Sequence, residues 1–255
     1  MTQKIISVAI QKGGCGKTTS TAALAEILTA RGHKVCVADF DPQASFTDAF
    51  GKDAKKSHVG FALDDMDPEP ITDLIQHNVG NGFDLVPAHL HLSRTEMTIP
   101  NMTDSDRRLK IALQPIKDQY DYILIDCLPG SGKLMLNALT ASTHVLIPMK
   151  PAVLDINGLA VFIETIKSVR KSLNRKLINA GIFLTMFNGR TNLHQEARTE
   201  IANSGYPFVD VQIPAGIKAA EATGFGKSIA TYAPKSKPAQ AYQLLADYVE
   251  SLELP

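Results

Sequence analysis

QKGGCGKTT, residues 11–19, is the stretch of sequence that decides the fold of this 255-residue chain. It follows an apolar run, residues 5–10, that is typical of a buried strand, and it precedes residues 20–28, whose apolar side chains have helical spacing. A strand, a glycine-rich turn and a helix N-terminus together form a phosphate cradle. The glycines let several backbone N–H groups point at one anion, and the helix dipole adds to their attraction. The stretch therefore predicts a P-loop.

Each residue type in this loop has a physical role. We expect Lys17 to reach the β- and γ-phosphates of a nucleotide, and the hydroxyl of Thr18 to hold Mg²⁺. The usual pattern has a glycine five residues before Gly16, where this chain has Gln11, and an additional lysine, Lys12, follows it. Lys12 lies too early in the loop to share the role of Lys17. The alternative is that Lys12 is a solvated side chain in a turn. The loop residues predicted to bind nucleotide are Gly13, Gly14, Cys15, Gly16, Lys17, Thr18 and Thr19.

Two further acidic segments are predicted to lie beside the loop. Residues 34–39 read as a strand that runs into Asp41, so Asp39 and Asp41 stand at a strand's carboxyl end, where open α/β sheets bind ligands. Residues 122–126 are an apolar strand that ends in Asp126, the Walker-B form in which a carboxylate holds the Mg²⁺ hydration shell. Taken alone, the first segment could be a helix-capping Asp-Pro turn, and the second a plain buried strand.

These motifs together resemble the ParA/MinD family of deviant-Walker ATPases, and most of all its short ParA/Soj type. The family's KGG-x-GKTT is matched by residues 12–19, its D-x-DPQ by residues 39–43, and its NALTA…VLIP…GL pattern by residues 137–159. The similarity runs from residue 5 to about residue 248 and is weakest over residues 51–115. It implies a slow, Mg²⁺-dependent ATPase that a partner protein stimulates, with ATP and Mg²⁺ as cofactors.

The resemblance also implies roles for individual residues. Lys12 would cross to the ATP of the other subunit in a face-to-face homodimer, Asp41 would orient the attacking water, and Asp39 would support the Mg²⁺ shell. The implied catalytic set is Lys12, Lys17 and Asp41, and the implied metal set is Thr18, Asp39 and Asp126. Asn188 and Pro214 would frame the adenine, although a turn asparagine and a strand-ending proline explain these two residues equally well.

ParA-type dimers bind DNA without sequence preference, and a ParB-like centromere-binding or adaptor protein triggers their hydrolysis. The resemblance therefore implies plasmid or chromosome partition and a cytoplasmic, nucleoid-associated location. Where the family often has an arginine, this chain has Ala215, so the basic patch is expected to be weaker or shifted. The alternative is scattered, solvated cations. The candidate DNA contacts are Arg190, Lys218, Lys227, Lys235 and Lys237.

Length and composition, taken with the P-loop motif, predict an α/β fold, a single P-loop NTPase domain over residues 1–255. With 44% hydrophobic residues, the chain can bury a mostly parallel, twisted sheet with helices on both faces. Twenty-six basic and 26 acidic residues balance, so a nucleic-acid surface must be a local patch. We see no room before residue 5 for an N-terminal DNA-binding domain. Residues 51–70 read as a polar surface connection, and His89 and His91 as packing residues for which no third metal ligand is evident.

Three other functions share parts of this pattern. A ParA relative that positions a protein cargo has the same chemistry and is left open. A MinD-like membrane ATPase needs a basic amphipathic helix, but the polar face of residues 240–252 carries acids, so its apolar stripe is expected to pack on the domain. No apolar run approaches the roughly 20 residues that span a bilayer. A metallocluster carrier needs paired cysteines, and Cys127 has no suitably placed second cysteine.

Overall fold

An eight-stranded sheet runs through the molecule in the order β3-β4-β2-β5-β1-β6-β7-β8. The computed structural model describes residues 3–52, 54–55, 57–151 and 155–255. Every pair of neighbouring strands is parallel except β3 and β4. The strands are β1 (Lys4–Val8), β2 (Val35–Phe40), β3 (Gln76–Val79), β4 (Phe83–Val86), β5 (Tyr122–Cys127), β6 (His144–Met149), β7 (Ile178–Phe187) and β8 (Phe208–Pro214).

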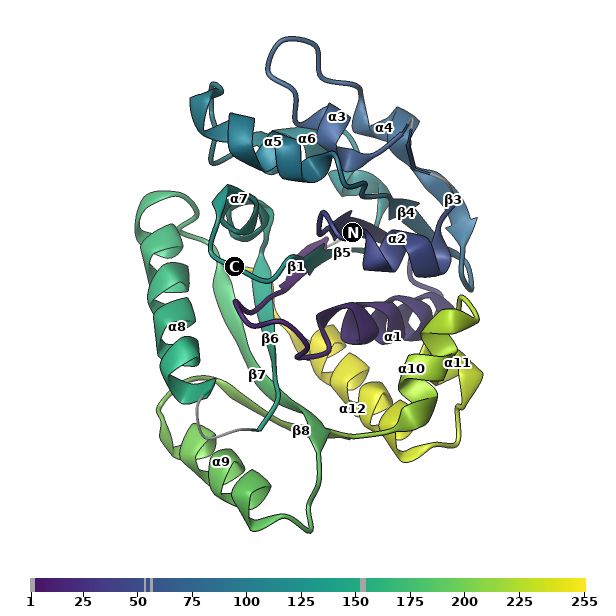
Figure 1. Cartoon of the computed structure of the whole chain (residues 1–255), viewed down its shortest axis with the longest axis vertical. Coiled ribbons are helices and arrows are strands. Elements are labelled where there is room, and N and C mark those ends of the chain that lie inside the picture. Colours follow the sequence, from purple (N-terminus) through teal and green to yellow (C-terminus); the bar gives the residue numbers. More distant parts are fainter. Residues whose placement is uncertain (1–2, 53, 56, 152–154) are drawn as a thin grey trace.

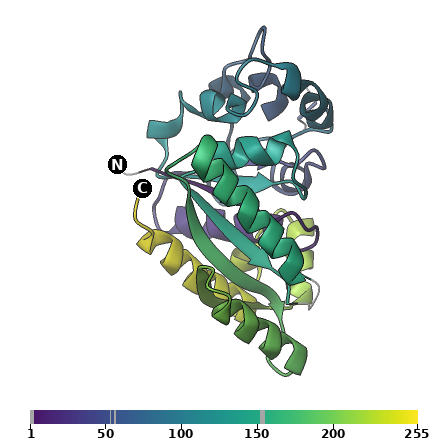
Figure 2. The same cartoon turned by 90° about the vertical axis from the view of Figure 1, so that its left-hand side faces the viewer.

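Helices connect the strands and cover both faces of the sheet (Figures 1 and 2). They are α1 (Lys17–Ala30), α2 (Ser45–Phe50), α3 (Val59–Ala62), α4 (Ile71–Leu74), α5 (Leu92–Thr98), α6 (Arg108–Leu113), α7 (Lys133–Ala141), α8 (Asp155–Ser172), α9 (Asn192–Asn203), α10 (Ile217–Gly224), α11 (Ile229–Tyr232) and α12 (Lys237–Ser251), with short 3₁₀ turns at Ile99–Asn101 and Lys117–Gln119.

The central strands have the continuous apolar sequences that a parallel sheet requires when helices cover both of its faces. All six residues of β2, of β5 and of β6 are buried. Two separate hydrophobic cores result. One lies between the sheet and α1, α2, α11 and α12, and the other lies between the sheet and α3 to α9. This double covering leaves the carboxyl ends of the strands as the edge where loops can form a site.

The predicted fold class is confirmed, and the strands predicted over residues 5–10, 34–39 and 122–126 are found as β1, β2 and β5, with boundaries shifted by at most two residues. Helix α6 ends at Leu113, two residues before Pro115, which cannot continue a helix. Residues 51–70 are more than a surface connection, since they include α3 and bury Val59 and Leu63 completely. Helix α9 and the antiparallel edge strand β3 were not expected.

The last helix packs on the domain as expected. Tyr242, Leu245 and Val249 of α12 are each 2% exposed or less, so its apolar stripe is not presented at the surface. Ser20 of α1 and Tyr242 join the two helices through a hydrogen bond of 3.0 Å between their hydroxyl groups. Among the described residues, no helix combines the length and the apolar character needed to cross a membrane.

Substitution of Phe83 tests the packing of α2 against the sheet. The Phe83 ring is fully buried and lies 5.8 Å from the rings of both Phe46 and Phe50 of α2. Phe83→Ala should lower the free energy of unfolding by about 3–5 kcal/mol, because it leaves a cavity in the core. Urea unfolding followed by circular dichroism measures the change. Met66→Ala, at a side chain that is 92% exposed, is the control. A loss at Phe83 no larger than that of the control would contradict the packing described here.

Candidate functional site: a phosphate loop beside two buried carboxyls

The P-loop joins β1 to α1 at the carboxyl edge of the sheet. Gly14 and Gly16 have φ angles of 71° and 80°, a left-handed conformation that favours glycine. No side chain caps the N-terminus of α1, so the backbone N–H groups of its first turn are available to an anion. The Lys17 ammonium is buried, and it donates a hydrogen bond of 3.2 Å to the carbonyl oxygen of Lys12. The loop therefore directs backbone N–H groups and one ammonium toward the place of a phosphate.

Thr185, on strand β7, fixes the P-loop through a hydrogen bond. Its hydroxyl donates a hydrogen bond of 2.9 Å to the carbonyl oxygen of Cys15, whose side chain is buried. A Cβ atom placed on Gly16 would lie 3.6 Å from the Thr185 methyl group, so the two segments are in close contact. The contact of Thr185 with the loop was not predicted from the sequence. The available signal was a threonine within the otherwise apolar run of residues 182–187.

Asp39 and Asp126 are paired neighbours on β2 and β5, and both are buried. One oxygen of Asp126 accepts a hydrogen bond of 3.2 Å from the hydroxyl of Thr21. Asp39 accepts from the backbone N–H and the hydroxyl of Thr47, at 2.9 and 2.7 Å, and from the N–H of Asp41 at 3.2 Å. The structure thus brings together the two strand-end acids that the sequence predicted, and it adds Thr21 and Thr47 as their partners.

Burial places these two carboxyls in an unfavourable electrostatic environment. Burial raises the pKa of Asp39 above its ordinary value, and the hydrogen bonds from Thr47 oppose that rise. Burial and then the charge of Asp39 raise the pKa of Asp126, against hydrogen bonds from Thr18 and Thr21 and the charge of Lys17. Two neighbouring carboxylates can both ionise here only with additional positive charge nearby.

The residues present fit Mg²⁺. Carboxylate and hydroxyl oxygens are the ligands and water-binding groups that Mg²⁺ prefers beside a phosphate, and Thr18, Asp39 and Asp126 supply them at one point next to the loop. A divalent cation would also provide the positive charge that the two buried acids lack. Mg²⁺ there would neutralise phosphate charge, a general function of the ion in phosphoryl transfer.

Asp41 and Lys12 lie at the solvent side of the same site. Asp41 follows β2, and its carboxylate accepts a hydrogen bond of 2.9 Å from the N–H of Gln43, which fixes the turn. Lys12 is exposed on the rim of the loop. The backbone N–H of Asp41 donates to the Asp39 carboxylate, and the carbonyl oxygen of Lys12 accepts from Lys17, so both residues adjoin the site.

A pocket of about 160 Å³ adjoins the loop on the side of α12. Gly16, Thr19 and Pro214 line it together with Thr185 and Tyr242. Pro214 therefore lies beside the first turn of α1, in the lining of this pocket.

Asn188 lies elsewhere. It is exposed, it is absent from the lining of this pocket, and it is bonded within its own turn to the N–H of Arg190 at 3.1 Å. Its backbone N–H donates to a ring nitrogen of His194 at 2.9 Å. These bonds match the turn asparagine that the sequence left as an alternative.

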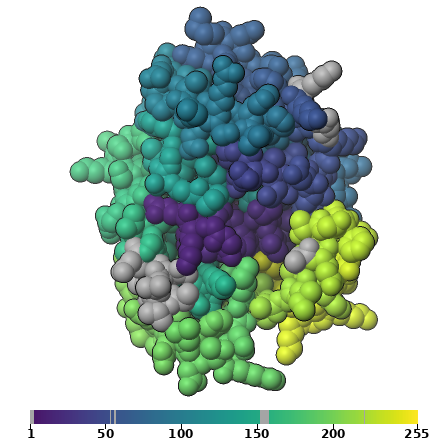
Figure 3. Space-filling view, viewed as in Figure 1, coloured from purple at the N-terminus to yellow at the C-terminus, as the bar shows by residue number. Residues whose placement is uncertain are grey.

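The five predicted DNA contacts are all exposed, but they come from two regions. Arg190 lies in the turn after β7, whereas four lysines lie on α10, on α12 and in the connections between α10, α11 and α12. These helices lie together at the right of Figure 1. Figure 3 shows their surface on the same face as the N-terminal segment that carries the loop. The four lysines are Lys218, Lys227, Lys235 and Lys237.

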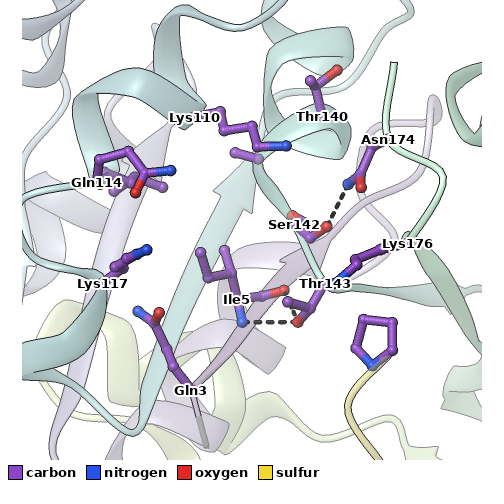
Figure 4. Close-up of a pocket in the computed structure, with 13 residues that line it drawn as sticks. Gln3, Ile5, Lys110, Gln114, Lys117, Thr140, Ser142, Thr143, Asn174 and Lys176 are labelled. Atoms are coloured by element: carbon purple, nitrogen blue, oxygen red, sulfur yellow. Dashed lines mark hydrogen bonds between the residues drawn. The ribbon is translucent and has the colours of Figure 1, made fainter. Parts of the chain in front are cut away.

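A second pocket, of about 220 Å³, lies at the opposite edge of the sheet and is separate from the loop. Figure 4 shows Lys110, Lys117 and Lys176 around it, near the starts of β1 and β6. The amino ends of parallel strands are not where open α/β sheets bind their ligands. The nucleotide site is therefore the one at the loop.

Comparisons with known proteins agree with this geometry. A family described as "AAA domain" matches residues 3–179. The sporulation initiation inhibitor protein Soj of Bacillus subtilis is 36% identical over 253 residues, which cover 96% of this chain and 98% of Soj. The chromosome partitioning protein ParA of Myxococcus xanthus is 34% identical over 99% of this chain and 89% of its own length.

A solved structure shares the complete fold. It is a cobyrinic acid a,c-diamide synthase from Mycobacterium smegmatis with bound ADP and magnesium. Its TM-score is 0.85 and its sequence identity 29%, and the alignment covers 100% of this chain and 98% of that one.

The buried carboxyl pair predicts an unusual dependence of stability on pH. Since folding raises both pKa values, the folded protein binds more protons than the unfolded chain at intermediate pH. The resulting stabilisation is fully present below about pH 4, the ordinary carboxyl value. It is lost as the pH rises through about 7 for Asp39 and about 8 for Asp126.

Asp126→Asn removes one of the two titrating groups and preserves the shape of the side chain. Without nucleotide, this variant should be more stable than the parent by on the order of 1–3 kcal/mol at about pH 8, and the difference should shrink toward about pH 5. Denaturant unfolding at both pH values measures it. A difference independent of pH would show that Asp126 is not held with a raised pKa.

Proposed function

The chain belongs to the AAA-domain family and is an ATPase of the ParA/Soj type, and on that premise we propose that ATP drives it to dimerise, to bind DNA without sequence preference and to support plasmid or chromosome partition with a partner protein. The observation that carries the proposal is the arrangement of the loop: Lys17 and the backbone N–H groups face inward beside Asp39 and Asp126, while Lys12 lies exposed on the rim.

Hydrolysis of ATP needs positioning and charge neutralisation more than covalent chemistry. Lys17 and the backbone N–H groups of the loop bind the β- and γ-phosphate oxygens. Thr18, Asp39 and Asp126 would hold Mg²⁺, which would supply further positive charge beside the phosphates. The carboxylate of Asp41 accepts a hydrogen bond from the attacking water and orients it. The position of Asp41 supports this role, because it directly follows the strand that carries Asp39.

Lys12 provides the switch in this proposal. The carbonyl oxygen of Lys12 accepts a hydrogen bond from the Lys17 ammonium, and this bond fixes the Lys12 backbone at the outer side of the loop. The side chain of Lys12 lies on the exposed rim. A second subunit docked face to face would bring another Lys12 toward the phosphates. A cation delivered in this way stabilises the charge of the transition state, as an arginine finger does, with an effect of roughly 10³–10⁵ on rate in other systems.

Lys12→Ala should separate dimerisation from nucleotide binding. We expect this variant to bind Mg·ATP with nearly the affinity of the parent, because Lys17 and the loop N–H groups are intact, and to stay monomeric when ATP is added. Lys17→Ala is the control, since it should lose binding itself. Nucleotide titration together with light scattering measures both properties. Dimerisation of Lys12→Ala at the parental ATP concentration would contradict delivery of Lys12 to a partner.

The proposed DNA surface is the part of α10 to α12 that carries the four exposed lysines. Because the total charge of the chain is zero, attraction to phosphates has to come from a local group of this kind. The lysine-bearing helices lie on the same face as the loop segment, so closing of a dimer at the loop would bring two such groups onto one DNA duplex (Figure 3). Pairing would explain why DNA binding should require ATP.

The combined variant Lys218→Ala, Lys235→Ala and Lys237→Ala tests this surface. The parent should bind duplex DNA of any sequence only with Mg·ATP. Fluorescence anisotropy over a range of salt concentrations should give a slope of log affinity against log salt that falls by about 0.9 for each phosphate contact removed. Lys171→Ala, an exposed lysine on α8, is the matched control. Equal affinity with and without nucleotide, or an unchanged slope in the triple variant, would contradict the assignment.

Membership of this family does not identify the cargo, which experiment has to decide. A ParB-like centromere-binding or adaptor protein is the proposed partner, and the name of the ParA relative, a chromosome partitioning protein, supports partition. A relative that positions a protein cargo would have the same nucleotide site. Burial of the apolar stripe of α12 gives no support to a MinD-like lipid anchor. The proposed cytoplasmic, nucleoid-associated location depends on the proposed DNA binding.

A further inference from the structure

Three histidines meet at one point close to α2, away from the P-loop. His58 immediately precedes α3, whereas His89 and His91 lie in the connection between β4 and α5. One ring nitrogen of each lies within 4.8 Å of those of the other two. The expectation that His89 and His91 have no third partner is therefore wrong, because the fold brings His58 to them from a distant part of the sequence.

His58 has a buried ring nitrogen without a partner. The side chain is 1% exposed, and its Nδ1 accepts a hydrogen bond of 3.1 Å from the N–H of Gly60. Among the described residues, nothing forms a hydrogen bond with its Nε2, which is shielded from solvent. A buried polar nitrogen of this kind is costly unless a ligand or an ion satisfies it.

His89 and His91 close the cluster toward solvent. The Nδ1 of His89 accepts from the backbone N–H of His91 at 3.3 Å, which directs its Nε2 away from its own backbone. The ring centres of His58 and His89 are 5.3 Å apart, those of His58 and His91 5.9 Å, and those of His89 and His91 4.6 Å. Burial decreases from His58 through His89 to His91, which is exposed, so an ion has a route from solvent to the buried nitrogen.

We propose that His58, His89 and His91 together bind one divalent transition-metal ion, with Zn²⁺ the best suited. Imidazole nitrogen is a preferred ligand of Zn²⁺, and three histidines leave a fourth tetrahedral position for water. Zn–N bonds of about 2.0–2.1 Å place the ligand nitrogens roughly 3.4 Å apart. Since the nitrogens lie within 4.8 Å of one another, they have to approach by at most about 1.4 Å, and the exposed His91 can move by rotation about its side-chain bonds.

Binding also changes the proton position on His58. The neutral ring that accepts from Gly60 at Nδ1 carries its proton on Nε2. When Nε2 binds the metal, that proton leaves to solvent and Nδ1 takes one up, so the ring stays neutral and the bond from Gly60 is given up. No net proton or electron is transferred.

The site is chemically distinct from the magnesium site. Its donors are nitrogens, which suit Zn²⁺, whereas Asp39, Asp126 and Thr18 offer oxygens, which suit Mg²⁺. Two hydrogen bonds connect the two sites. The N–H of Ala88 donates to the Thr47 hydroxyl at 2.9 Å, and that hydroxyl donates to Asp39 at 2.7 Å.

Isothermal titration of tag-free, nucleotide-free protein with ZnCl₂ tests the proposal. One ion should bind per chain, and His91→Ala and His89→Gln should each weaken binding roughly tenfold or more. His91 is exposed, so its replacement leaves the core intact. His77→Ala, another exposed histidine, should bind as the parent does. Asp126→Asn should also retain binding, which separates this site from the acidic pair.

Substitution by Co²⁺ gives a second readout. The parent should show the visible absorption of a four-coordinate Co²⁺ ion, and His91→Ala should lose it. If the rings only pack together, as His58 does on Phe61 with ring centres 4.2 Å apart, no saturable binding will be found. Absence of saturable binding, or binding equally strong in His89→Gln and His91→Ala, would overturn the proposal.

Discussion

Two carboxyl groups buried side by side set the conditions for the rest of the site. Asp39 and Asp126 stand on neighbouring strands with almost no exposure, and their ionised forms repel each other in a medium that solvates charge poorly. The surrounding residues compensate only in part, through the hydroxyls of Thr21 and Thr47. An arrangement of this kind costs stability in the empty protein and favours binding of a cation, which links folding at this edge to the nucleotide and its Mg²⁺.

The loop is held by contacts that come from separate parts of the chain. Lys17 bonds across the loop to Lys12, and Thr185 bonds to Cys15 from a strand far along the sequence. These two bonds fix the backbone on both sides of the glycines, so the N–H groups are aligned before an anion arrives. Preorganisation of this kind lets the loop bind phosphate without rearrangement. The Lys12 side chain itself lies at the surface.

Local sequence was sufficient for the parts of the site that lie on one segment. The glycines and Lys17, and the apolar strand ending in Asp126, are short patterns whose chemistry is carried by adjacent residues. Thr185 and Thr47 could not be predicted in the same way, because their roles depend on which segments the fold brings together. For the same reason the burial of Val59 could not be predicted from the polar composition of residues 51–70. The approach of His58 to His89 also depends on the fold and could not be predicted.

In the proposed switch, residues of two subunits act on each ATP, and a mixture of two defective variants can separate this arrangement from a site within one subunit. Lys12→Ala lacks the donated ammonium, and Asp41→Ala lacks the residue that orients water, but both retain Lys17. Lys12→Ala does not pair with itself, but the Lys12 of an Asp41→Ala subunit would still reach its ATP. In such a mixed dimer the site on the Lys12→Ala subunit has its own Asp41 and receives Lys12 from its neighbour. The mixture should hydrolyse ATP although each variant alone does not. A mixture no more active than its components would contradict the proposed switch.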